Sequence, residues 1–301
     1  MRIAFFGSPS PYYRGIIRNL AELGHRITFH EPGVREDVLD ETASADVVVN
    51  AGAFDELLER EVIARRRVGQ IVIFWDTDAP ATLNRMTENP SDPFRSLVSR
   101  YDLIFTSGGG DPVVARYRNF GAAQCIPIYN ALDPMTHHRV ARRPEFEADL
   151  SYLGDRLRDR EARVDEFFFR AAERLPNARF LLGGSGWDEK VTPQSVSYIG
   201  RVLDVDHNAF LCTPRAVLDV SGESTAANGW SPSMRFFEAA GAAACVITDA
   251  WEGIEGFLDR GTEVLVAEDG DQVAEIIRDL DPERAAAIGR AALRRVLAQH
   301  T

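Results

Sequence analysis

Short apolar runs alternate with helix-like segments along the whole chain, which is typical of parallel sheets with helices on both faces. In the first half this pattern predicts strands at residues 3–6, 27–30, 47–50, 71–75, 103–106 and 124–128, with helices at 16–23 and 113–120. In the second half it predicts strands at residues 150–153, 179–182, 196–199, 216–220, 245–248 and 264–267. Helices are expected there at 161–174, 207–211, 234–240, 272–280 and 282–299. The sequence therefore predicts an α/β fold with two Rossmann-like βαβ domains.

An irregular segment separates the two alternating halves. Residues 130–147 hold two prolines, the adjacent pair His137 and His138 and several arginines, with no periodicity. The histidine pair is expected to be solvated, because His and Cys partners at metal-ligand spacing are missing from the sequence. We expect three parts: a first domain at 1–133, a linker at 134–149 and a second domain at 150–301.

The composition is that of a soluble globular protein, with 45% hydrophobic and 27% charged residues. No apolar run reaches the ~18 residues of a membrane span, and the apolar start of the chain is too short for a signal peptide, so we expect a cytoplasmic protein. The formal net charge of -12 argues against a nucleic-acid partner held by the overall field. Cys125, Cys212 and Cys245 are expected to be buried thiols, because they are widely spaced and odd in number.

The segment from Asn228 to Asp249 carries the clearest chemical pattern. Ser233 is a favoured helix N-cap, so a helix is expected to begin at Met234. Free backbone N–H groups and the helix dipole favour a phosphate at that start, and Arg235 adds a full charge in the first turn. Glu238, at i+3 from Arg235, could take the hydroxyls of a ribose. The alternative is an ordinary Arg–Glu surface pair on a helix.

The same segment resembles a known enzyme family. Residues 237–241, followed by the strand at 245–248, are similar to the donor-site helix of glycosyltransferases with the GT-B fold. The CgeB-like (spore-maturation) branch is most similar, since an arginine lies there three residues before the glutamate, as Arg235 does here. The resemblance implies a nucleotide-sugar site in the second domain and an acceptor side in the first. Many retaining members have a second glutamate where this chain has Trp230, so the resemblance does not imply a stereochemical outcome.

Asp76, Thr77 and Asp78 directly follow an apolar strand. They form an Asp-x-Asp pattern, which in the GT-A class of glycosyltransferases binds a metal-nucleotide complex through carboxylate oxygens. A plain turn before Pro80 is a second interpretation. The third comes from the resemblance to CgeB-like proteins, which places this segment in the acceptor-side domain. We prefer the third, with Asp76 or Asp78 as the general base that takes the acceptor proton.

Two further loops of the first half are candidates for ligand contact, because ligands bind beyond the carboxyl ends of parallel strands. The loop at 7–15 contains Gly7 and Tyr12, and Gly109 lies in a run of three glycines after the fifth strand. With Glu31, the first loop also suggests a dinucleotide-binding Rossmann domain. Its prolines and missing glycines argue against such an NAD enzyme.

In the second half, Arg156 and Arg160 follow the first strand, where the resemblance implies cations for the donor diphosphate. Their alternative is pairing with the neighbouring acids Asp155, Asp159 and Glu161. The resemblance adds two more segments with expected substrate contacts. Their residues are Gly184 and Trp187 in the first, and Tyr198, Gly200 and Arg201 in the second.

Taken together, the sequence predicts a glycosyltransferase that moves a sugar from a nucleotide diphosphate donor, preferably a UDP-sugar, to an acceptor hydroxyl. No cofactor or divalent metal is expected, and nucleic acid is not the expected acceptor. Ser233, Met234, Arg235 and Glu238 are the main expected donor contacts. Two alternatives stay open: a sugar-nucleotide 2-epimerase, and a sugar-nucleotide binder without activity.

Overall fold

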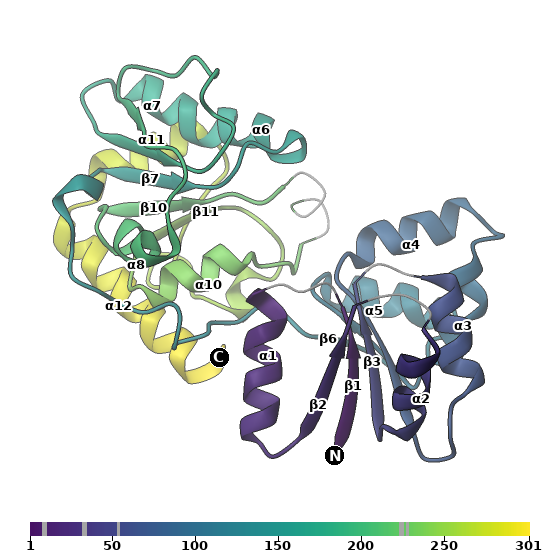
Figure 1. The fold of residues 1–301 in the computed structure, drawn as a ribbon. Coiled ribbons are helices and arrows are strands. Elements are labelled where there is room, and N and C mark those ends of the chain that lie inside the picture. Colours follow the sequence, from purple (N-terminus) through teal and green to yellow (C-terminus); the bar gives the residue numbers. More distant parts are fainter. Residues whose placement is uncertain (8–10, 32–34, 53–54, 223–225, 227–228) are drawn as a thin grey trace. The chain divides into compact units, whose positions relative to one another are not determined.

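The computed structural model describes residues 1–7, 11–31, 35–52, 55–222, 226 and 229–301. It forms two compact units, Met1–Tyr129 and Asn130–Thr301 (Figure 1). The expected domain boundary was residue 133, followed by a linker at 134–149. In the structure residues 130–149 pack within the second unit: Leu132 is buried and its N–H donates to His300 O (2.8 Å).

The first unit contains a parallel sheet in the order β2-β1-β3-β4-β5-β6. Its strands are β1 Arg2–Phe6, β2 Arg26–His30, β3 Val47–Ala51, β4 Ile71–Asp76, β5 Leu103–Thr106 and β6 Cys125–Pro127. Its helices are α1 Pro11–Glu22, α2 Glu36–Ser44, α3 Glu56–Ala64, α4 Ala79–Glu88 and α5 Gly110–Asn119, with short 3₁₀ turns at Pro93–Ser96 and Val98–Arg100. Because successive side chains alternate between the faces of a strand, Phe74 and Trp75 pack into separate clusters on the two faces.

The second unit repeats this plan with the order β12-β11-β10-β7-β8-β9, again all parallel. Its strands are β7 Leu150–Leu153, β8 Phe180–Gly183, β9 Val196–Tyr198, β10 Ala216–Asp219, β11 Val246–Asp249 and β12 Leu265–Ala267. Its helices are α6 Arg158–Val164, α7 Arg170–Arg174, α8 Asp204–Cys212, α10 Met234–Gly241, α11 Gly270–Asp279 and α12 Pro282–Gln299. Three short turns complete the unit: η3 Pro144–Phe146, η4 Asp165–Phe169 and η5 Ile254–Gly256. Figure 1 shows helices on both faces of each sheet.

The prediction of two Rossmann-like units is confirmed, and each expected strand overlaps an observed one. Helix positions differ more from the prediction. Helix α1 begins at Pro11, inside the segment expected to be a loop, because proline suits the first turn of a helix. Helices α2, α3 and α4 were not predicted. The expected helix at 161–174 is interrupted by a π turn at Asp165–Phe169.

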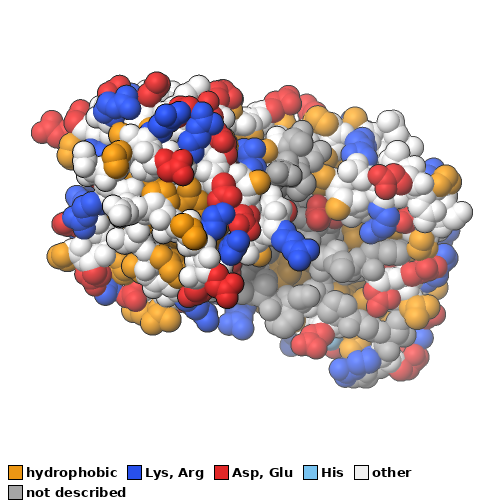
Figure 2. Space-filling view, turned by 90° about the horizontal axis from the view of Figure 1, so that it is seen from above, with side chains coloured by type: hydrophobic (Ala, Val, Ile, Leu, Met, Phe, Trp, Pro, Cys, Tyr) orange, Lys and Arg blue, Asp and Glu red, His pale blue; other side chains and the backbone are white. Residues whose placement is uncertain are grey.

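Among the described helices, none combines the length and the apolar character that crossing a bilayer requires. On the face shown in Figure 2, acidic and basic side chains are interspersed. Cys125 and Cys245 are buried thiols, as predicted, whereas Cys212 is only half-buried.

Candidate functional site

The candidate donor site lies at the carboxyl edge of the second sheet. The strands β7, β8, β10 and β11 are parallel neighbours or near neighbours in this sheet, so their carboxyl ends lie at the same edge. Those ends are Leu153, Gly183, Asp219 and Asp249. Helix α10 begins at the same edge, because it follows β10 and returns the chain to the amino end of β11.

The first turn of α10 is built as predicted around Ser233. Its Oγ accepts from the N–H of Phe236 (3.0 Å) and donates to a carboxylate oxygen of Asp219 (2.8 Å). This anchors the helix start to the end of β10. Met234, the first residue of α10, has a side chain that is 41% exposed. The start of the helix therefore combines a fixed backbone with access to solvent.

Arg235 and Glu238 form an ion pair within this helix, with 2.7 Å between Nη1 and Oε2. Their side chains are only 23% and 12% exposed, so this is not an ordinary surface pair. The Nε of Arg235 is buried and has no hydrogen-bond partner in the part of the chain that the structure describes. Because a buried N–H without an acceptor is unfavourable, this group is suited to an acceptor oxygen from a ligand.

Two histidines extend this pair into a chain of hydrogen bonds. Arg235 Nη1 contacts Nε2 of His207, on α8, and an arginine can only donate. His207 Nε2 is therefore the acceptor, and its proton lies on Nδ1, which points at His137 Nε2 (3.2 Å). His137 Nδ1 in turn donates to Thr136 Oγ1 (3.0 Å). The order of donors fixes the tautomer of both rings.

Burial keeps these histidines neutral. Burial lowers the pKa of His137. Burial, the charge of Arg235 and the neighbouring His137 lower the pKa of His207 to about 3. The expectation that the histidine pair is solvated is therefore wrong for His137, which packs against His207 and Glu238. It is right for His138, whose side chain is exposed.

Two predicted cations, Arg160 and Arg235, both act on the carboxyl group of Asp219. Burial raises its pKa to about 6, while the hydrogen bond from Ser233 and the charges of Arg160 and Arg235 act in the opposite direction. The same two arginines also oppose the raised pKa of the buried Tyr152 hydroxyl on β7. Arg160 and Arg235, which are 75 positions apart by their numbers, therefore act on the same two groups.

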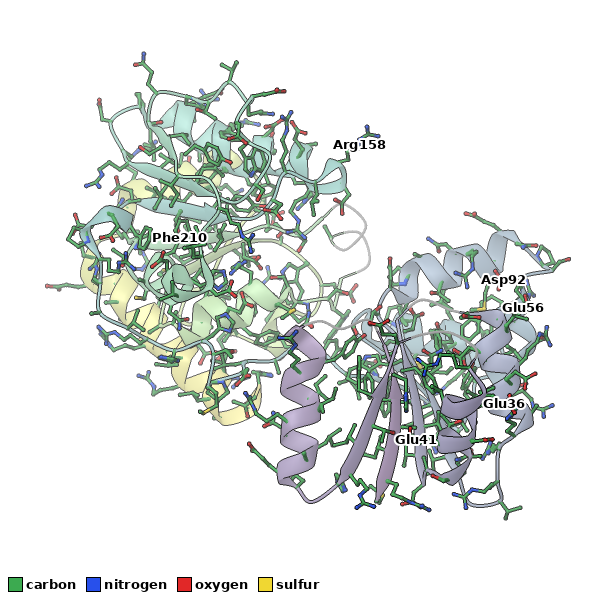
Figure 3. All side chains as sticks on the ribbon, in the orientation of Figure 1. Glu36, Glu41, Glu56, Asp92, Arg158 and Phe210 are labelled. Carbon is green, nitrogen blue, oxygen red and sulfur yellow. The ribbon has the colours of Figure 1, made fainter. Side chains whose placement is uncertain are left out.

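The structure distinguishes between Arg156 and Arg160. Arg156 is paired with Glu161 (2.7 Å), as the alternative interpretation expected. Arg160 has no ion pair within the described residues, and its Nε is buried without a partner. Arg158 extends away from the start of α6 and is exposed (Figure 3). Arg160 is thus a partly buried cation of this segment whose Nε is left for a ligand.

The loops after β7 and β8 hold the glycines and aromatic residues of the prediction. Trp187 is 1% exposed and donates from its indole N–H to Gly154 O (2.8 Å), so it supports the loop from within the core. A Cβ on Gly184 would come within 2.1 Å of Gly154 O. Tyr198 donates to Gly184 O (2.9 Å), and Gly184 donates to Gly200 O (2.9 Å). These contacts bring the predicted loop residues together, and Arg201 beside them is exposed.

In the first unit the two predicted base candidates have different surroundings. Asp76 is 2% exposed and accepts from Asp78 N (3.0 Å), from the Thr82 hydroxyl (3.2 Å) and from the Tyr117 hydroxyl. Burial raises its pKa. Asp78 is exposed and caps helix α4, so the interpretation as a plain turn before Pro80 is replaced by a helix start. Only Asp78 of this pair is open to a substrate.

Three further predicted residues of the first unit follow its strands. Gly7 donates to His30 O (3.0 Å) at the end of β1. Gly109 has a φ of 86° and precedes α5, and a Cβ there would lie 2.1 Å from Val113 Cγ2. The side chain of Tyr12 lies outside the described part of the chain. Glu31, the residue of the dinucleotide alternative, is exposed beyond β2.

Sequence reasoning missed His207 and the acids at the ends of β10 and β11. Asp219 and Asp249 each follow an apolar strand, which is the signal that singled out Asp76. Asp249 is fully buried and paired with Arg163 (2.7 Å). His207 lies in a helix with little amphipathic pattern, and no local signal links it to Arg235.

Among the described residues, one set of side chains has the spacing of metal ligands: ligand atoms of His137, His207 and Glu238 lie within 4.8 Å of one another. However, the contact with Arg235 places a proton on Nδ1 of His207, the atom that points at His137 Nε2. A metal ion there would have to displace this proton and also tolerate the neighbouring guanidinium charge. At the Asp-x-Asp segment, both carboxylate oxygens of Asp76 are engaged in hydrogen bonds.

Comparison with known proteins gives a partial match to a family model and a fold. Residues 158–301 match the family model described as glycosyl transferase-like. The sequence matches no curated protein. Three solved structures are similar over nearly the whole chain. Sucrose-phosphate synthase of Thermosynechococcus elongatus has a TM-score of 0.70 and 13% identity, with 100% of this chain and 95% of that chain covered. Anabaena HepE in complex with UDP-glucose has a TM-score of 0.65 and 12% identity, with 98% of this chain and 95% of that chain covered. T4 phage BGT with its UDP-glucose substrate has a TM-score of 0.65 and 12% identity, with 99% of this chain and 96% of that chain covered.

These similarities agree with the two parallel-sheet units and with a helix start rich in anion-binding groups in the matched half. The protein has the two-domain GT-B fold found in glycosyltransferases, and residues 158–301 are similar to the glycosyl transferase-like family.

Proposed function

We propose that this glycosyltransferase moves a sugar from a UDP-sugar to an acceptor hydroxyl. The observation that carries the proposal is that, among the described residues, the buried Nε groups of Arg160 and Arg235 have no hydrogen-bond partner. Both arginines act on Asp219, which accepts from Ser233 at the start of α10. Two guanidinium groups that each keep a buried Nε donor without an acceptor suit the oxygens of a diphosphate. UDP-glucose is the ligand named for HepE and T4 BGT, which share the fold and support uridine as the donor base.

In this proposal Glu238 holds the ribose. Its Oε2 is engaged by Arg235, but Oε1 lies 3.6 Å from His137 Nε2, too far for a strong hydrogen bond. Oε1 is therefore available to accept from a ribose hydroxyl. Arg235 would then contact the diphosphate while holding Glu238 in place.

The transfer forms a bond from the acceptor oxygen to C1 of the sugar and breaks the bond from C1 to the diphosphate oxygen. Negative charge grows on the leaving diphosphate, where Arg160 and Arg235 would stabilise it. The acceptor loses a proton, and Asp78 would take it, because its carboxylate is exposed whereas that of Asp76 is enclosed. Met234, Gly184, Gly200 and Arg201 would complete the donor pocket, and Gly7 and Gly109 the acceptor side.

Three finer features belong to the same proposal: membership of the CgeB-like branch, activity without a divalent metal, and a cytoplasmic location. The Arg235–Glu238 spacing supports the first. The proton on His207 Nδ1 and the engaged oxygens of Asp76 support the second. Activity that persists in EDTA would agree with it, and activity that is lost in EDTA and restored by Mg²⁺ would contradict it.

Calorimetric titration with UDP tests the donor site. Glu238→Ala is expected to weaken UDP binding at least tenfold, because it removes the ribose acceptor and leaves Arg235 without its partner. Glu275→Ala, an exposed glutamate on α11, removes the same charge and should change the affinity less than twofold. Equal affinities of the Glu238→Ala and wild-type proteins would overturn the assignment.

Product analysis tests the reaction. A transferase incubated with UDP-glucose and a library of hydroxyl acceptors releases free UDP. A 2-epimerase would return an isomerised UDP-sugar, and a binder would leave the donor unchanged. Either of these last two results would contradict the proposed transfer while leaving the donor site in place.

A further inference from the structure

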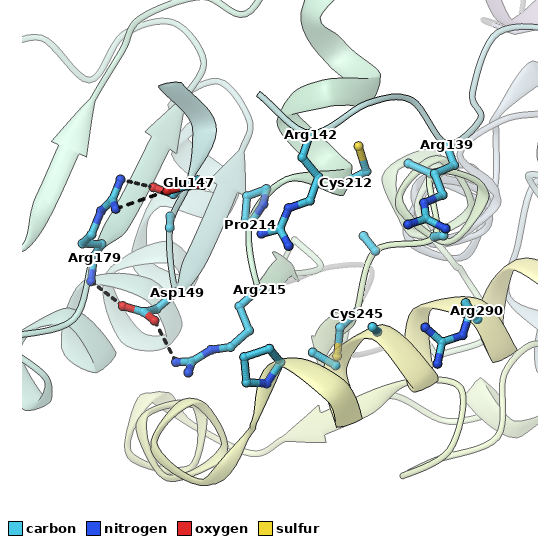
Figure 4. A pocket seen from close by; sticks show the side chains of 17 residues that line it. Arg139, Arg142, Glu147, Asp149, Arg179, Cys212, Pro214, Arg215, Cys245 and Arg290 are labelled. Carbon is cyan, nitrogen blue, oxygen red and sulfur yellow. Dashed lines mark hydrogen bonds and ion pairs between the residues drawn. The ribbon is translucent and has the colours of Figure 1, made fainter. Parts of the chain in front are cut away.

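A cavity of about 340 Å³ lies at the opposite edge of the second sheet from the candidate donor site (Figure 4). Its walls include Asp149, Arg179, Arg215 and Cys245, the residues immediately before β7, β8, β10 and β11. These strands are parallel, so their amino ends share one edge and their carboxyl ends the other. Strands of four residues span roughly 13 Å, which separates the cavity from the start of α10. Its volume falls in the range of small-molecule sites.

Arginines dominate the charge of this cavity. Five of them line it, with two acids. Asp149 pairs with Arg215 (3.0 Å), and Glu147 lies 3.8 Å from Arg179. Within the described chain, the remaining three arginines have no acidic partner. They are Arg139, Arg142 and Arg290.

This local excess of positive charge is notable in a chain with a net charge of -12, because nothing in the overall field would gather cations there. Arg142 donates to Thr213 O, whereas the side chains of Arg139 and Arg290 have no hydrogen bond to any described residue. In Figure 4 the side chains of Arg139 and Arg142 extend from their segment toward helix α12, which carries Arg290.

Inside the cavity, Arg215 also has unmet hydrogen-bonding capacity. Its Nη2 is engaged by Asp149 and by Ile277 O (3.0 Å), but its Nε is buried and no described residue accepts from it. An acceptor oxygen in the cavity would satisfy that donor. Small residues, among them Ala243, Ala244 and Ala285, form the apolar part of the wall and leave room for the uncharged part of a ligand.

We propose that this cavity is a second ligand site, which binds a small molecule that carries at least two negative charges on phosphate groups. Guanidinium groups match phosphate oxygens in geometry and charge, and three unpaired arginines exceed what a single carboxylate would neutralise. Asp281 accepts from Arg284 N (2.7 Å) as the cap of α12 and does not line the cavity. The site is distinct from the proposed donor site and does not depend on it.

Calorimetric titration with inorganic pyrophosphate tests this site in a protein that carries Arg235→Ala, which disables the proposed diphosphate contact on α10. One saturable site is expected to remain. Adding Arg290→Ala should weaken pyrophosphate binding at least tenfold. Adding Arg294→Ala instead, an exposed arginine one turn further along α12 that does not line the cavity, should change it less than twofold.

Arg139→Ala provides a second, independent variant and is expected to act like Arg290→Ala. Both side chains are exposed, so the variants should keep the melting temperature of the parent protein. The proposal is overturned if no saturable pyrophosphate site remains in the Arg235→Ala protein. It is also overturned if the Arg290 and Arg294 variants weaken binding equally, since that would indicate only general attraction to a charged helix.

Discussion

His207 on α8 accepts a hydrogen bond from Arg235 at the start of α10, so a histidine fixes the arginine at the centre of the proposed donor site. This contact requires His207 Nε2 to be unprotonated. Protonation would place two cations against each other and release Arg235 from its present position. The hydrogen bond therefore couples the order of the donor site to pH.

We expect acid to destabilise the second unit through His207. Its folded pKa is about 3, below the ordinary histidine value of 6.5, so between these pH values the unfolded chain binds more protons than the folded one. The free energy of unfolding must then fall as pH falls through that window. His207→Gln keeps an acceptor but cannot titrate. Its free energy of unfolding, measured with urea between pH 7 and 5, should fall less steeply than that of the wild type, by up to ~1 kcal/mol per pH unit.

His138→Gln is the matched control, because His138 is an exposed histidine on the segment that holds His137. It should follow the pH dependence of the wild-type protein. If His207→Gln and His138→Gln give the same slopes, the pKa of His207 is not lowered in the folded protein.

The second prediction compares two arginines four positions apart. Arg160→Ala should weaken UDP binding at least tenfold, because the unpartnered Nε lies beside the start of α10. Arg156→Ala should weaken it less than threefold, because that guanidinium is paired with Glu161. Glu161 would keep Lys190 (3.0 Å) as a partner, so the variant should remain folded. Calorimetry on both variants gives the answer, and the reverse order of affinities would assign the diphosphate to Arg156.

The third prediction separates a catalytic aspartate from a structural one. Asp78→Asn should lower kcat at least 100-fold with little change in melting temperature, because the exposed carboxylate is the proposed base and the amide can still cap α4. Asp76→Ala should lower the free energy of unfolding by ~2 kcal/mol, because it leaves the buried Tyr117 hydroxyl without an acceptor. Kinetics and urea unfolding of both variants test this. A stable Asp76→Ala protein without activity would reverse the roles.

The strands and the start of α10 were predictable because their causes are local. Apolar runs of four to six residues bounded by turn residues are too short for a typical helix and favour buried strands, and Ser233 caps the helix that follows β10. Helix α4 was missed because Asp78 and Pro80 are equally good in turns and at helix starts. Its burial against the sheet, through Leu83 and Met86, decides between the two.

The partners within the site could not be predicted, because they come from residues far apart in the chain. Arg235 suggested a phosphate site by its place in the first turn, yet nothing local showed that His207 would accept its N–H. Arg156 and Arg160 look equivalent in sequence. Only the fold shows that Glu161 neutralises one of them and leaves the other facing Asp219.

The last prediction concerns Glu59, a fully buried glutamate of α3 whose Oε2 accepts from the Tyr101 hydroxyl at 2.5 Å. Burial raises its pKa from 4.5 to about 7, although the hydrogen bond from Tyr101 acts to lower it. Because the folded state keeps a proton that the unfolded state releases above pH 4.5, Glu59 contributes stability that is full below that pH. This contribution is lost as pH rises through about 7. From pH 5 to 8 the wild-type first unit should lose up to ~3 kcal/mol through this group.

Glu59→Gln keeps an acceptor for Tyr101 without a titrating carboxyl, so this loss should be absent in the variant. Urea unfolding at pH 5 and 8, followed by hydrogen exchange in peptides from α3, reports on the first unit alone. Glu56→Gln is the control at the start of the same helix. The Glu56 carboxylate pairs with Arg60 (2.9 Å) near solvent, so this variant should retain the wild-type pH dependence. If Glu59→Gln loses as much stability as the wild type between these pH values, Glu59 is ionised in the folded protein at neutral pH. The buried carboxylate would then need a cation or water that reaches its second oxygen.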